Sequence, residues 1–288
     1  MYLIVDIFLA VRWIEGFIPE CMSIRFGIKL KGEKMTKVLI FGAMGVMGRN
    51  VANCAKAMDD IEIIAGLDRE DHLDDPAFGF PVYSSFDKVK EEFDVIIDFS
   101  VAPAINGLLD YVEKTGKPCV QCTTGLSEEQ LARVKEISNK APILRSANMS
   151  IGVNLLLSLV KEAANKLYEK GFDIDIVEQH HRRKADAPSG TAIALADAVN
   201  EALDNKMAYV YDRSNRREAR PHDEIGVSAV RGGTIAGVHD IIFAGEDEVI
   251  TFNHTAYSRN IFANGALNAA KFLNGKAAGL YSMQDVLA

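Results

Sequence analysis

The stretch Lys37-Val-Leu-Ile-Phe41-Gly42-Ala-Met-Gly45-Val-Met-Gly48 decides the fold of this 288-residue chain. Residues 38–41 of this stretch are apolar and predict a short buried strand that begins at Lys37. The residues from Arg49 to Met58 have a helical pattern. A strand, a glycine-rich turn and a helix in this order are typical of a dinucleotide-binding unit. The spacing G-x-x-G-x-x-G departs from the usual G-x-G-x-x-G, so a plain tight turn is the alternative.

The strand predicted over residues 61–67 ends in an acidic residue, Asp68. A carboxylate in this place can accept hydrogen bonds from the adenosine ribose, while the pyrophosphate lies at the helix N-terminus. Arg69 can instead hold a 2′-phosphate, so both NADH and NADPH are candidate cofactors. The cofactor contacts expected from this part of the chain are Gly42, Ala43, Met44, Gly45, Val46, Met47, Asp68 and Arg69.

Strand and helix patterns go on alternating along the chain. Residues 94–100, 118–122 and 142–145 read as strands, and Ser127 and Gln130 have the spacing of a helix capping box. This alternation predicts an α/β fold with a Rossmann-type, doubly wound parallel sheet. Ligands of such sheets bind beyond the carboxyl ends of the strands. That rule places four residues near the nicotinamide: Ser100, Thr123, Thr124 and Asn148.

A second domain is expected after the first sheet. A long apolar helix over residues 151–171 precedes strands at 227–231, 237–244 and 248–258, which suggests a largely antiparallel sheet. We therefore predict a dinucleotide-binding domain over 35–150, completed by 260–288. A second α+β domain for substrate binding and oligomerisation covers 151–259. Residues 1–34 form an N-terminal extension to which the sequence assigns no role.

The chemical centre of the chain is Val177-Glu-Gln-His-His-Arg-Arg-Lys-Ala-Asp-Ala-Pro-Ser-Gly-Thr-Ala192. The predicted strand before it delivers His180 and His181 at its end, and a helix is expected to begin near Ser189. A helix N-terminus is an anion-binding site, Lys184 adds positive charge, and histidines transfer protons near neutral pH. A strand end with a solvated lysine is the structural alternative. The convergence of these groups favours an acid-base site for a carboxylate.

His180-His181-x-x-Lys184-x-Asp186-x-Pro188-Ser189-Gly190-Thr191-Ala192 resembles the signature of the dihydrodipicolinate reductase family. The resemblance implies that NADH or NADPH reduces a cyclic dicarboxylate, 4-hydroxy-tetrahydrodipicolinate, in lysine and diaminopimelate biosynthesis. It makes His180 and Lys184 the catalytic proton-transfer residues. The residues that would bind the substrate are His181, Gly190 and Thr191.

The resemblance continues through the rest of residues 35–288. In this family, Gly-Thr-Thr-Gly and Ala-Asn-Phe-Ser-x-Gly-x-Asn segments contact the cofactor, which adds Cys122, Ser146, Ala147 and Met149 to the expected contacts. Cys122 replaces the usual first glycine and Met149 an aromatic residue, which puts close backbone approach and ring stacking at these positions in question. Two further family matches, Arg231 and His239, are left outside the catalytic set. The family resemblance also implies a homotetramer.

Charge and composition exclude several other classes of protein. The net charge of −8 argues against a nucleic-acid partner, and the cluster of Arg213, Arg216, Arg217 and Arg220 is interpreted as a solvated loop. No apolar run approaches the roughly 20 residues of a membrane span. Four cysteines without a secretory signal fit a reducing cytoplasm. Cys119 and Cys122 have metal-ligand spacing but no second pair, so they are interpreted as strand residues and no metal site is predicted.

Two other functions fit parts of the sequence. An amino-acid or amine dehydrogenase would use the same fold on an acyclic substrate, and an amine-oxidation assay would reveal it. A nicotinamide-sensing regulator would bind the cofactor without turnover. The intact His-His-x-x-Lys and Pro-Ser-Gly-Thr motifs favour the reductase over both alternatives.

Overall fold

A computed structural model describes residues 35–72, 76–146 and 148–288. The predicted N-terminal extension, residues 1–34, lies outside the described residues, and so does Ala147. Among the described residues, no helix is both long and apolar enough to cross a membrane.

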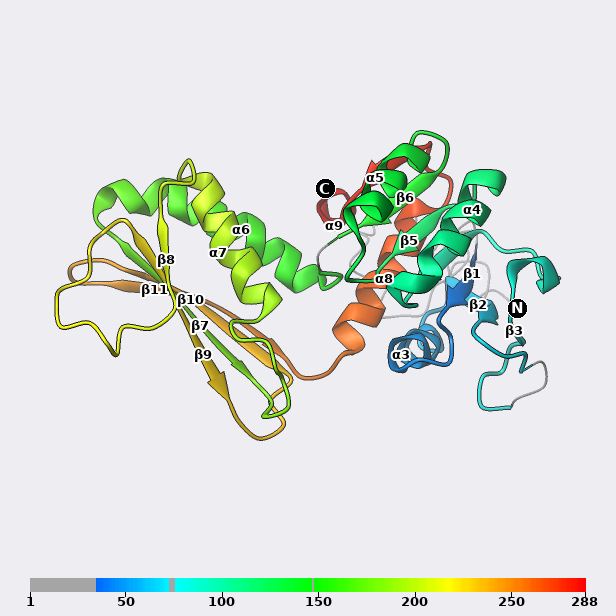
Figure 1. Cartoon of the computed structure of the whole chain (residues 1–288), viewed down its shortest axis with the longest axis horizontal. Helices are drawn as coiled ribbons and strands as arrows, with labels where there is room; N and C mark the ends of the chain where they lie inside the picture. Colours follow the sequence, from blue (N-terminus) through cyan, green and yellow to red (C-terminus); the bar gives the residue numbers. More distant parts are fainter. Residues whose placement is uncertain (1–34, 73–75, 147) are drawn as a thin grey trace, which may run out of the picture. The chain divides into compact units, whose positions relative to one another are not determined.

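Seven parallel strands form the first sheet, in the order β12-β6-β5-β4-β1-β2-β3 (Figure 1). They are β1 Thr36–Phe41, β2 Ile61–Leu67, β3 Val82–Tyr83, β4 Val95–Asp98, β5 Cys119–Gln121, β6 Pro142–Arg145 and β12 Gly279–Tyr281. Short apolar strands of this kind are buried on both faces, which is the pattern that parallel sheets require. The predicted doubly wound sheet is confirmed.

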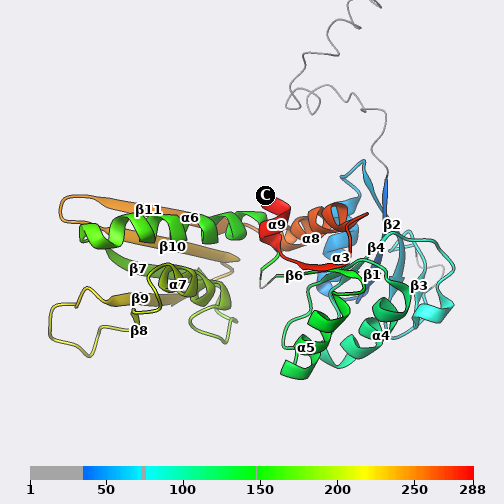
Figure 2. The same cartoon turned by 90° about the horizontal axis from the view of Figure 1, so that it is seen from above.

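Helices cover both faces of this sheet (Figure 2). One core contains residues of α3, α8 and α9, and a second core on the opposite face contains residues of α4 and α5. The helices are α3 Val46–Ala55, α4 Ile105–Thr115, α5 Glu128–Ile137, α8 Asn260–Leu273 and α9 Met283–Leu287. Short 3-10 turns span Phe86–Lys88, Ala102–Ala104 and Tyr168–Lys170.

Local signals in the sequence set several of these helix ends. The predicted capping box is present at α5, where the Gln130 N–H donates to Ser127 Oγ over 3.2 Å and the Ser127 N–H donates to Gln130 Oε1 over 3.0 Å. Helix α3 begins at Val46, earlier than the expected Arg49. Gly48 therefore lies inside the helix, where a Cβ would come within 2.3 Å of the Gly42 carbonyl oxygen. The absence of a side chain at Gly48 therefore allows helix α3 to pack closely on the glycine-rich turn.

The second sheet has five strands in the order β11-β10-β7-β9-β8. They are β7 Asp173–His180, β8 Ala208–Val210, β9 Glu224–Arg231, β10 Gly237–Ala244 and β11 Val249–Ala256. Helices α6, Ile151–Leu167, and α7, Gly190–Ala202, pack on one face of it (Figures 1 and 2). The expected long helix thus ends before Gly171, which has a left-handed φ of 86°.

This sheet is mixed, so the expectation of a largely antiparallel sheet was wrong. β10 pairs antiparallel with β7 and β11, but β9 pairs parallel with both β7 and β8. The chain passes from β7 through α7 to β8, and this helical crossover returns it in the same direction. It then reaches β9 through residues 211–223, and β9 pairs parallel with β7 on one side and with β8 on the other.

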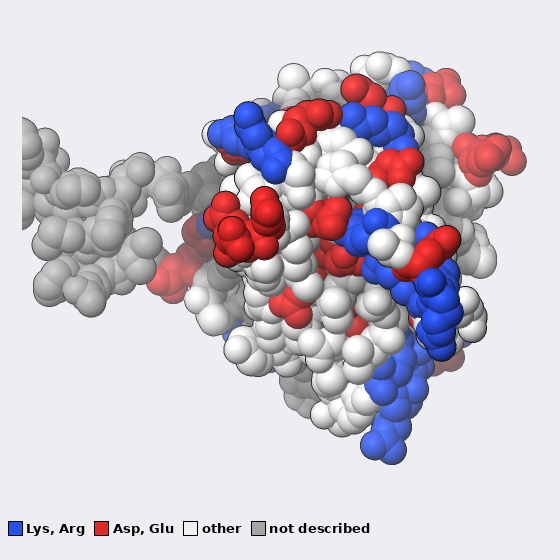
Figure 3. All heavy atoms as spheres, turned by 90° about the vertical axis from the view of Figure 1, so that its left-hand side faces the viewer, with Lys and Arg blue, Asp and Glu red and all other residues white. Residues whose placement is uncertain are grey.

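Three of the four arginines interpreted as a solvated loop, Arg213, Arg216 and Arg220, instead form ion pairs on the second sheet, so that interpretation was wrong for these three. Arg217 is exposed and donates to backbone carbonyl groups. Arg213 donates to Asp175 over 2.7 Å and to Glu224 over 2.9 Å, and Arg216 reaches the other oxygen of Glu224 over 2.8 Å. Glu224 is 2% exposed, so burial requires its charge to be paired. Figure 3 shows basic and acidic side chains next to one another on this side of the molecule.

Candidate active site

The glycine-rich turn borders a cavity of about 630 Å³. Gly42 has a φ of +83° and lies so close to β4 that a Cβ would be 2.6 Å from the Phe99 carbonyl oxygen. Gly45 precedes α3 without a side-chain cap, so the first N–H groups of the helix remain available to an anion. The predicted cofactor residues Gly42, Met44, Gly45, Asp68, Arg69 and Ser100 all line this cavity.

Asp68 lies at the edge of the cavity and ties the end of β2 to the turn. Its Oδ2 accepts the N–H of Met44 over 2.8 Å, and its Oδ1 accepts the N–H of Arg69 over 2.9 Å. Each carboxylate oxygen has a further lone pair for a ribose hydroxyl. Asp68 therefore has a structural role in addition to the predicted cofactor contact.

Hydroxyl groups meet at the carboxyl ends of β4 and β5. Ser100 Oγ is 3.3 Å from Thr123 Oγ1, and the Ser100 N–H donates to Asp98 over 2.9 Å. Asp98 is fully buried, and burial raises the pKa of its carboxyl group. Thr124 is exposed beside this group. The structure thus brings Ser100 and Thr123 together where the strand order predicted a nicotinamide contact.

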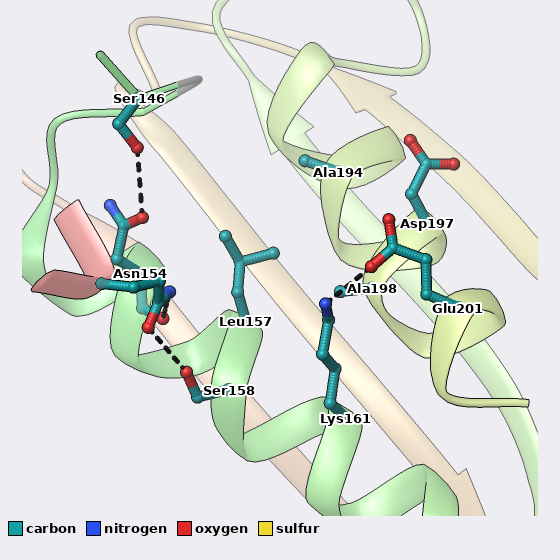
Figure 4. A pocket seen from close by; sticks show the side chains of 10 residues that line it. Ser146, Asn154, Leu157, Ser158, Lys161, Ala194, Asp197, Ala198 and Glu201 are labelled. Atoms are coloured by element: carbon teal, nitrogen blue, oxygen red, sulfur yellow. Dashed lines mark hydrogen bonds and ion pairs between the residues drawn. The ribbon is translucent and has the colours of Figure 1, made fainter. Parts of the chain in front are cut away.

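Other predicted cofactor residues lie elsewhere. The Met149 side chain is 4% exposed and belongs to the core under α8, and Cys122 is partly buried against the same core. Ser146 lines a different cavity of about 480 Å³ between α6 and α7, and its hydroxyl is 3.4 Å from the Asn154 side chain (Figure 4). Ala43 is buried in the core.

His180 ends β7 and is held by a buried carboxylate. Its Nδ1 is 2.6 Å from Glu178 Oε2, and Glu178 has no exposed surface. Arg231 on β9 donates hydrogen bonds to both carboxylate oxygens of Glu178, over 2.7 and 2.8 Å. Burial acts to raise the pKa of Glu178, but the hydrogen bonds from Arg231, His180 and the Ser189 N–H outweigh it and lower this pKa.

His239 joins His180 to the start of α7. Its ring lies edge-on to that of His180, 5.2 Å between centroids, and its Nε2 is 3.0 Å from Ser189 Oγ. Ser189 is the N-cap of α7, because its Oγ accepts the Ala192 N–H over 3.2 Å. Burial, followed by the proximity of His180, lowers the pKa of His239 to about 4. His239 is thus neutral at physiological pH.

A small cavity of about 50 Å³ lies beside His180. Thr191 and Asn148, both predicted site residues, line it, and the Asn148 side-chain amide donates to Thr191 Oγ1 over 3.1 Å. Arg259, which the sequence did not mark as a site residue, lines it too. A guanidinium beside an imidazole and a hydroxyl suits a carboxylate ligand.

The remaining predicted residues lie on the loop between β7 and α7. Lys184 Nζ is 2.9 Å from Asp186 Oδ2, and the lysine hydrogen bond lowers the pKa of Asp186. His181 is half-buried, and its Nδ1 has no hydrogen-bond partner among the described residues. Gly190 is exposed as the first residue of α7, and no described atom lies within 4 Å of where its Cβ would be.

Glu178 was missed from the sequence, and Arg231 and His239 were noted only as family matches outside the catalytic set. Glu178 and His180 share the face of β7 that carries Ile174 and Ile176 into the core, because alternate residues of a strand point the same way. A carboxylate at Glu178, on the apolar face of the predicted strand, was the feature of the sequence that could have indicated a buried functional residue. Pairing of Arg231 and His239 with Glu178 depends on strand register, which the sequence does not provide.

Comparisons with known proteins identify the family of this chain. Residues 36–149 match the model "Dihydrodipicolinate reductase, N-terminus", and residues 152–287 match "Dihydrodipicolinate reductase, C-terminus". The 4-hydroxy-tetrahydrodipicolinate reductase of Caldanaerobacter subterraneus subsp. tengcongensis is 53% identical, over 88% of this chain and 98% of the relative. That of Clostridium tetani is 45% identical, over 88% and 97%.

A solved structure supports the fold. A dipicolinate-bound dihydrodipicolinate reductase from Paenisporosarcina sp. TG-14 aligns with a TM-score of 0.72 and 24% identity, over 88% of this chain and all of that one. A myo-inositol 2-dehydrogenase from Lactobacillus plantarum aligns less closely, with a TM-score of 0.55 and 10% identity, over 88% and 94%. With sequence relatives at up to 53% identity over nearly their whole length, this chain belongs to the dihydrodipicolinate reductase family.

Proposed function

We propose that this chain is a 4-hydroxy-tetrahydrodipicolinate reductase of lysine and diaminopimelate biosynthesis. The observation that carries the proposal is the 50 Å³ cavity at the start of α7, where His180, Thr191 and Arg259 meet. This set offers a proton-transfer group and two groups that bind carboxylate. A cyclic dicarboxylate needs both kinds of group at one place.

The residues around the glycine-rich turn fit a dinucleotide. The turn has no side chains at Gly42 and Gly45, and α3 presents an uncapped N-terminus to the 630 Å³ cavity. NADH or NADPH would supply the hydride when bound. We infer that both serve, because Asp68 suits a free ribose while the exposed Arg69 can pair with a 2′-phosphate. Ser100, Thr123, Thr124 and Asn148 would contact the nicotinamide end.

In this proposal the loop between β7 and α7 supplies the acid-base groups. Lys184 donates the proton to the substrate, and its charge attracts the dianion. His180 takes part in proton transfer through Nε2, since its Nδ1 is occupied by Glu178. His181, Gly190 and Thr191 bind the carboxylates, the latter two at the N-terminus of α7.

One coupled assay tests this function. The purified protein is mixed with NADH or NADPH and freshly made product of the synthase that forms 4-hydroxy-tetrahydrodipicolinate, and nicotinamide absorbance is followed. We expect oxidation of the cofactor only when the synthase product is present. Cofactor binding without turnover would instead identify a sensor, and oxidation of acyclic amines with NAD⁺ would identify an amine dehydrogenase.

We further infer a division of labour along the chain. Residues 35–150 with 260–288 would bind the dinucleotide, and 151–259 would bind substrate and other copies of the chain. On the second sheet, the face away from α6 and α7 exposes Val230 by 47% and Val249 by 61%. Apolar side chains on an open sheet face favour self-association, and the family resemblance favours four copies. Light scattering should give a tetramer, and Val230→Lys with Val249→Lys should dissociate it.

We place the protein in the cytoplasm, where its proposed cofactor and pathway are found. The described cysteines Cys54, Cys119 and Cys122 are free thiols, as expected in a reducing compartment. Cell fractionation with an antibody would test this placement.

A further inference from the structure

We propose that Glu178, paired with Arg231, is a positioning residue that fixes the imidazole of His180 with Nδ1–H toward the carboxylate and Nε2 toward the substrate. The inference rests on the proposed role of His180 in proton transfer and extends it to two residues that do not touch the substrate cavity. Neither residue lines the 50 Å³ cavity in which His180 lies.

Hydrogen-bond accounting determines which ring nitrogen carries the proton. Glu178 Oε1 accepts from the Ser189 N–H over 2.9 Å and from Arg231 over 2.7 Å, while Oε2 accepts from Arg231 over 2.8 Å. A carboxylate so surrounded by donors acts only as an acceptor. His180 Nδ1, 2.6 Å from Oε2, must therefore be the donor. In the neutral ring, Nε2 is then the free acceptor.

The sheet around His180 keeps Nε2 accessible. Gly237 on β10 is next to His180, and a Cβ at this glycine would be 3.0 Å from Nε2. The edge-on ring of His239 limits rotation on the same side. The ring is thus held at Nδ1 by hydrogen bonding and on its sides by packing. Such fixation of a catalytic histidine by a buried carboxylate sets the tautomer that acid-base catalysis requires.

The charges facing His180 come from several elements. Glu178 on β7 carries the negative charge, Arg231 on β9 balances it, and Arg259 lines the same cavity as His180. The positive charge of Lys184, on the following loop, acts on the neighbouring His239. His239 on β10 and His254 on β11 continue the row across the sheet, since His239 is in register with both Glu178 and His254. Burial lowers the pKa of each of these two histidines. Both therefore contribute little charge at neutral pH.

Because Glu178 and Arg231 carry opposite charges, the proposal predicts opposite effects when each of them is removed. Removing the carboxylate makes the protonated ring of His180 less stable, whereas removing the guanidinium makes it more stable. A purely structural role would lower activity in both variants without moving their pH profiles in opposite directions.

The test compares Glu178→Gln and Arg231→Gln with Glu162→Gln, which removes an exposed carboxylate on α6 paired with Lys166. The pH profile of kcat/KM is measured for each variant. The change of kcat/KM with pH that depends on His180 is identified as the step in the profile that is absent in His180→Ala. We expect this step to move to lower pH in Glu178→Gln and to higher pH in Arg231→Gln. Glu178→Gln should also lose roughly 10²-fold in kcat, because its amide no longer enforces the tautomer.

Nitrogen-15 NMR of histidine-labelled protein reads the tautomer directly and needs no turnover. We expect His180 in the wild type and in Arg231→Gln to carry its proton on Nδ1, and in Glu178→Gln to show the other tautomer as well. An unchanged tautomer and an unchanged profile in Glu178→Gln would overturn the proposal. A wild type that oxidises no cofactor with the synthase product would overturn the proposed function instead, while the NMR result would still report on the positioning.

Discussion

Asn148, on the loop after β6, donates its side-chain amide to the hydroxyl of Thr191, the second residue of α7, over 3.1 Å. Because Thr191 Oγ1 is the acceptor in this bond, its own O–H is left to donate to another group. That group can be a substrate carboxylate in the adjoining cavity. Asn148 thus links the first sheet to the proposed carboxylate site.

Thr191→Val removes this donor while nearly keeping the side-chain volume. Loss of a hydrogen bond to a charged group costs about 1.5 to 3 kcal/mol, so KM for the substrate should rise about 10- to 100-fold. Thr191→Ser keeps the hydroxyl and serves as the control, with KM within a few fold of the wild type. Steady-state kinetics at saturating cofactor measures both, and an unaltered KM in Thr191→Val would remove Thr191 from the site.

Lys184 tests which residue donates the proton. Lys184→Ala should lower kcat roughly 10²- to 10⁴-fold, the usual contribution of a general acid. Lys184→Arg keeps the charge but is a very poor proton donor, so it should restore KM without restoring kcat. Cofactor binding, followed by nicotinamide fluorescence, should stay unchanged in both variants. Recovery of turnover by arginine would make Lys184 an electrostatic anchor and leave proton donation to His180 or water.

Asp68 is predicted to set the choice of cofactor. Asp68→Asn keeps an acceptor for the Met44 N–H but removes the charge that repels a 2′-phosphate. We expect the ratio of kcat/KM for NADPH to that for NADH to increase. Asp68→Ala should in addition weaken binding of both cofactors, because the turn loses its hydrogen bond. Equal ratios in the wild type and Asp68→Asn would contradict the assignment.

Gly237 offers a steric test of His180. In Gly237→Ala the new methyl group would lie 3.0 Å from Nε2, which is tighter than ordinary contact and blocks the proposed proton path. We expect a marked fall in kcat with unaltered cofactor binding. Gly232→Ala is the matched control, since no described atom lies within 4 Å of its Cβ position. Equal activity of the two variants would show that Nε2 does not face the reaction.

His239 predicts how stability depends on pH. Its pKa falls from an ordinary 6.5 to about 4 on folding, so the folded state favours the neutral ring. The stabilisation is fully present above pH 6.5 and is lost as the pH falls toward 4, by roughly 3 kcal/mol at most. Urea unfolding between pH 7 and 5 should show this decline. His239→Asn should flatten it, and an equally steep decline in that variant would refute the origin assigned to it.

Much of the fold follows from local patterns. Period-two alternation predicted β7 with His180 at its end, and the Ser127 and Gln130 spacing predicted the cap of α5. The short strands β3, β8 and β12, of two, three and three residues, escaped prediction because they are too short to show a period. The direction of β9 escaped it too, since alternation fixes which face a residue occupies but not which neighbour its strand takes.

For the candidate site too, residues within one local motif could be predicted, whereas residues paired across the sheet could not. His180, Lys184 and the start of α7 lie in one continuous motif and could be read directly. Glu178 lay within that motif but was passed over, because a buried carboxylate gains meaning only from its partner Arg231, 53 residues away. Ser146 was expected at the cofactor from the family resemblance, and that contact stays a prediction, while its side chain lines the cavity between α6 and α7.

The pairing of β12 with β6 has a consequence for biosynthesis on the ribosome. Gly279–Tyr281 pairs with Pro142–Leu144, and α8 supplies six buried residues from Ala263 to Leu273 to the protein's first core around β1, β4 and β5. These segments are synthesised after the second sheet, although the sheet they complete begins at Thr36. Until the whole second sheet has been translated, this face of the nascent first sheet has α3 on it but lacks α8 and α9. Long-range closure of this kind slows folding and lengthens exposure to aggregation, so the first core can close only after α8 and β12 have been synthesised.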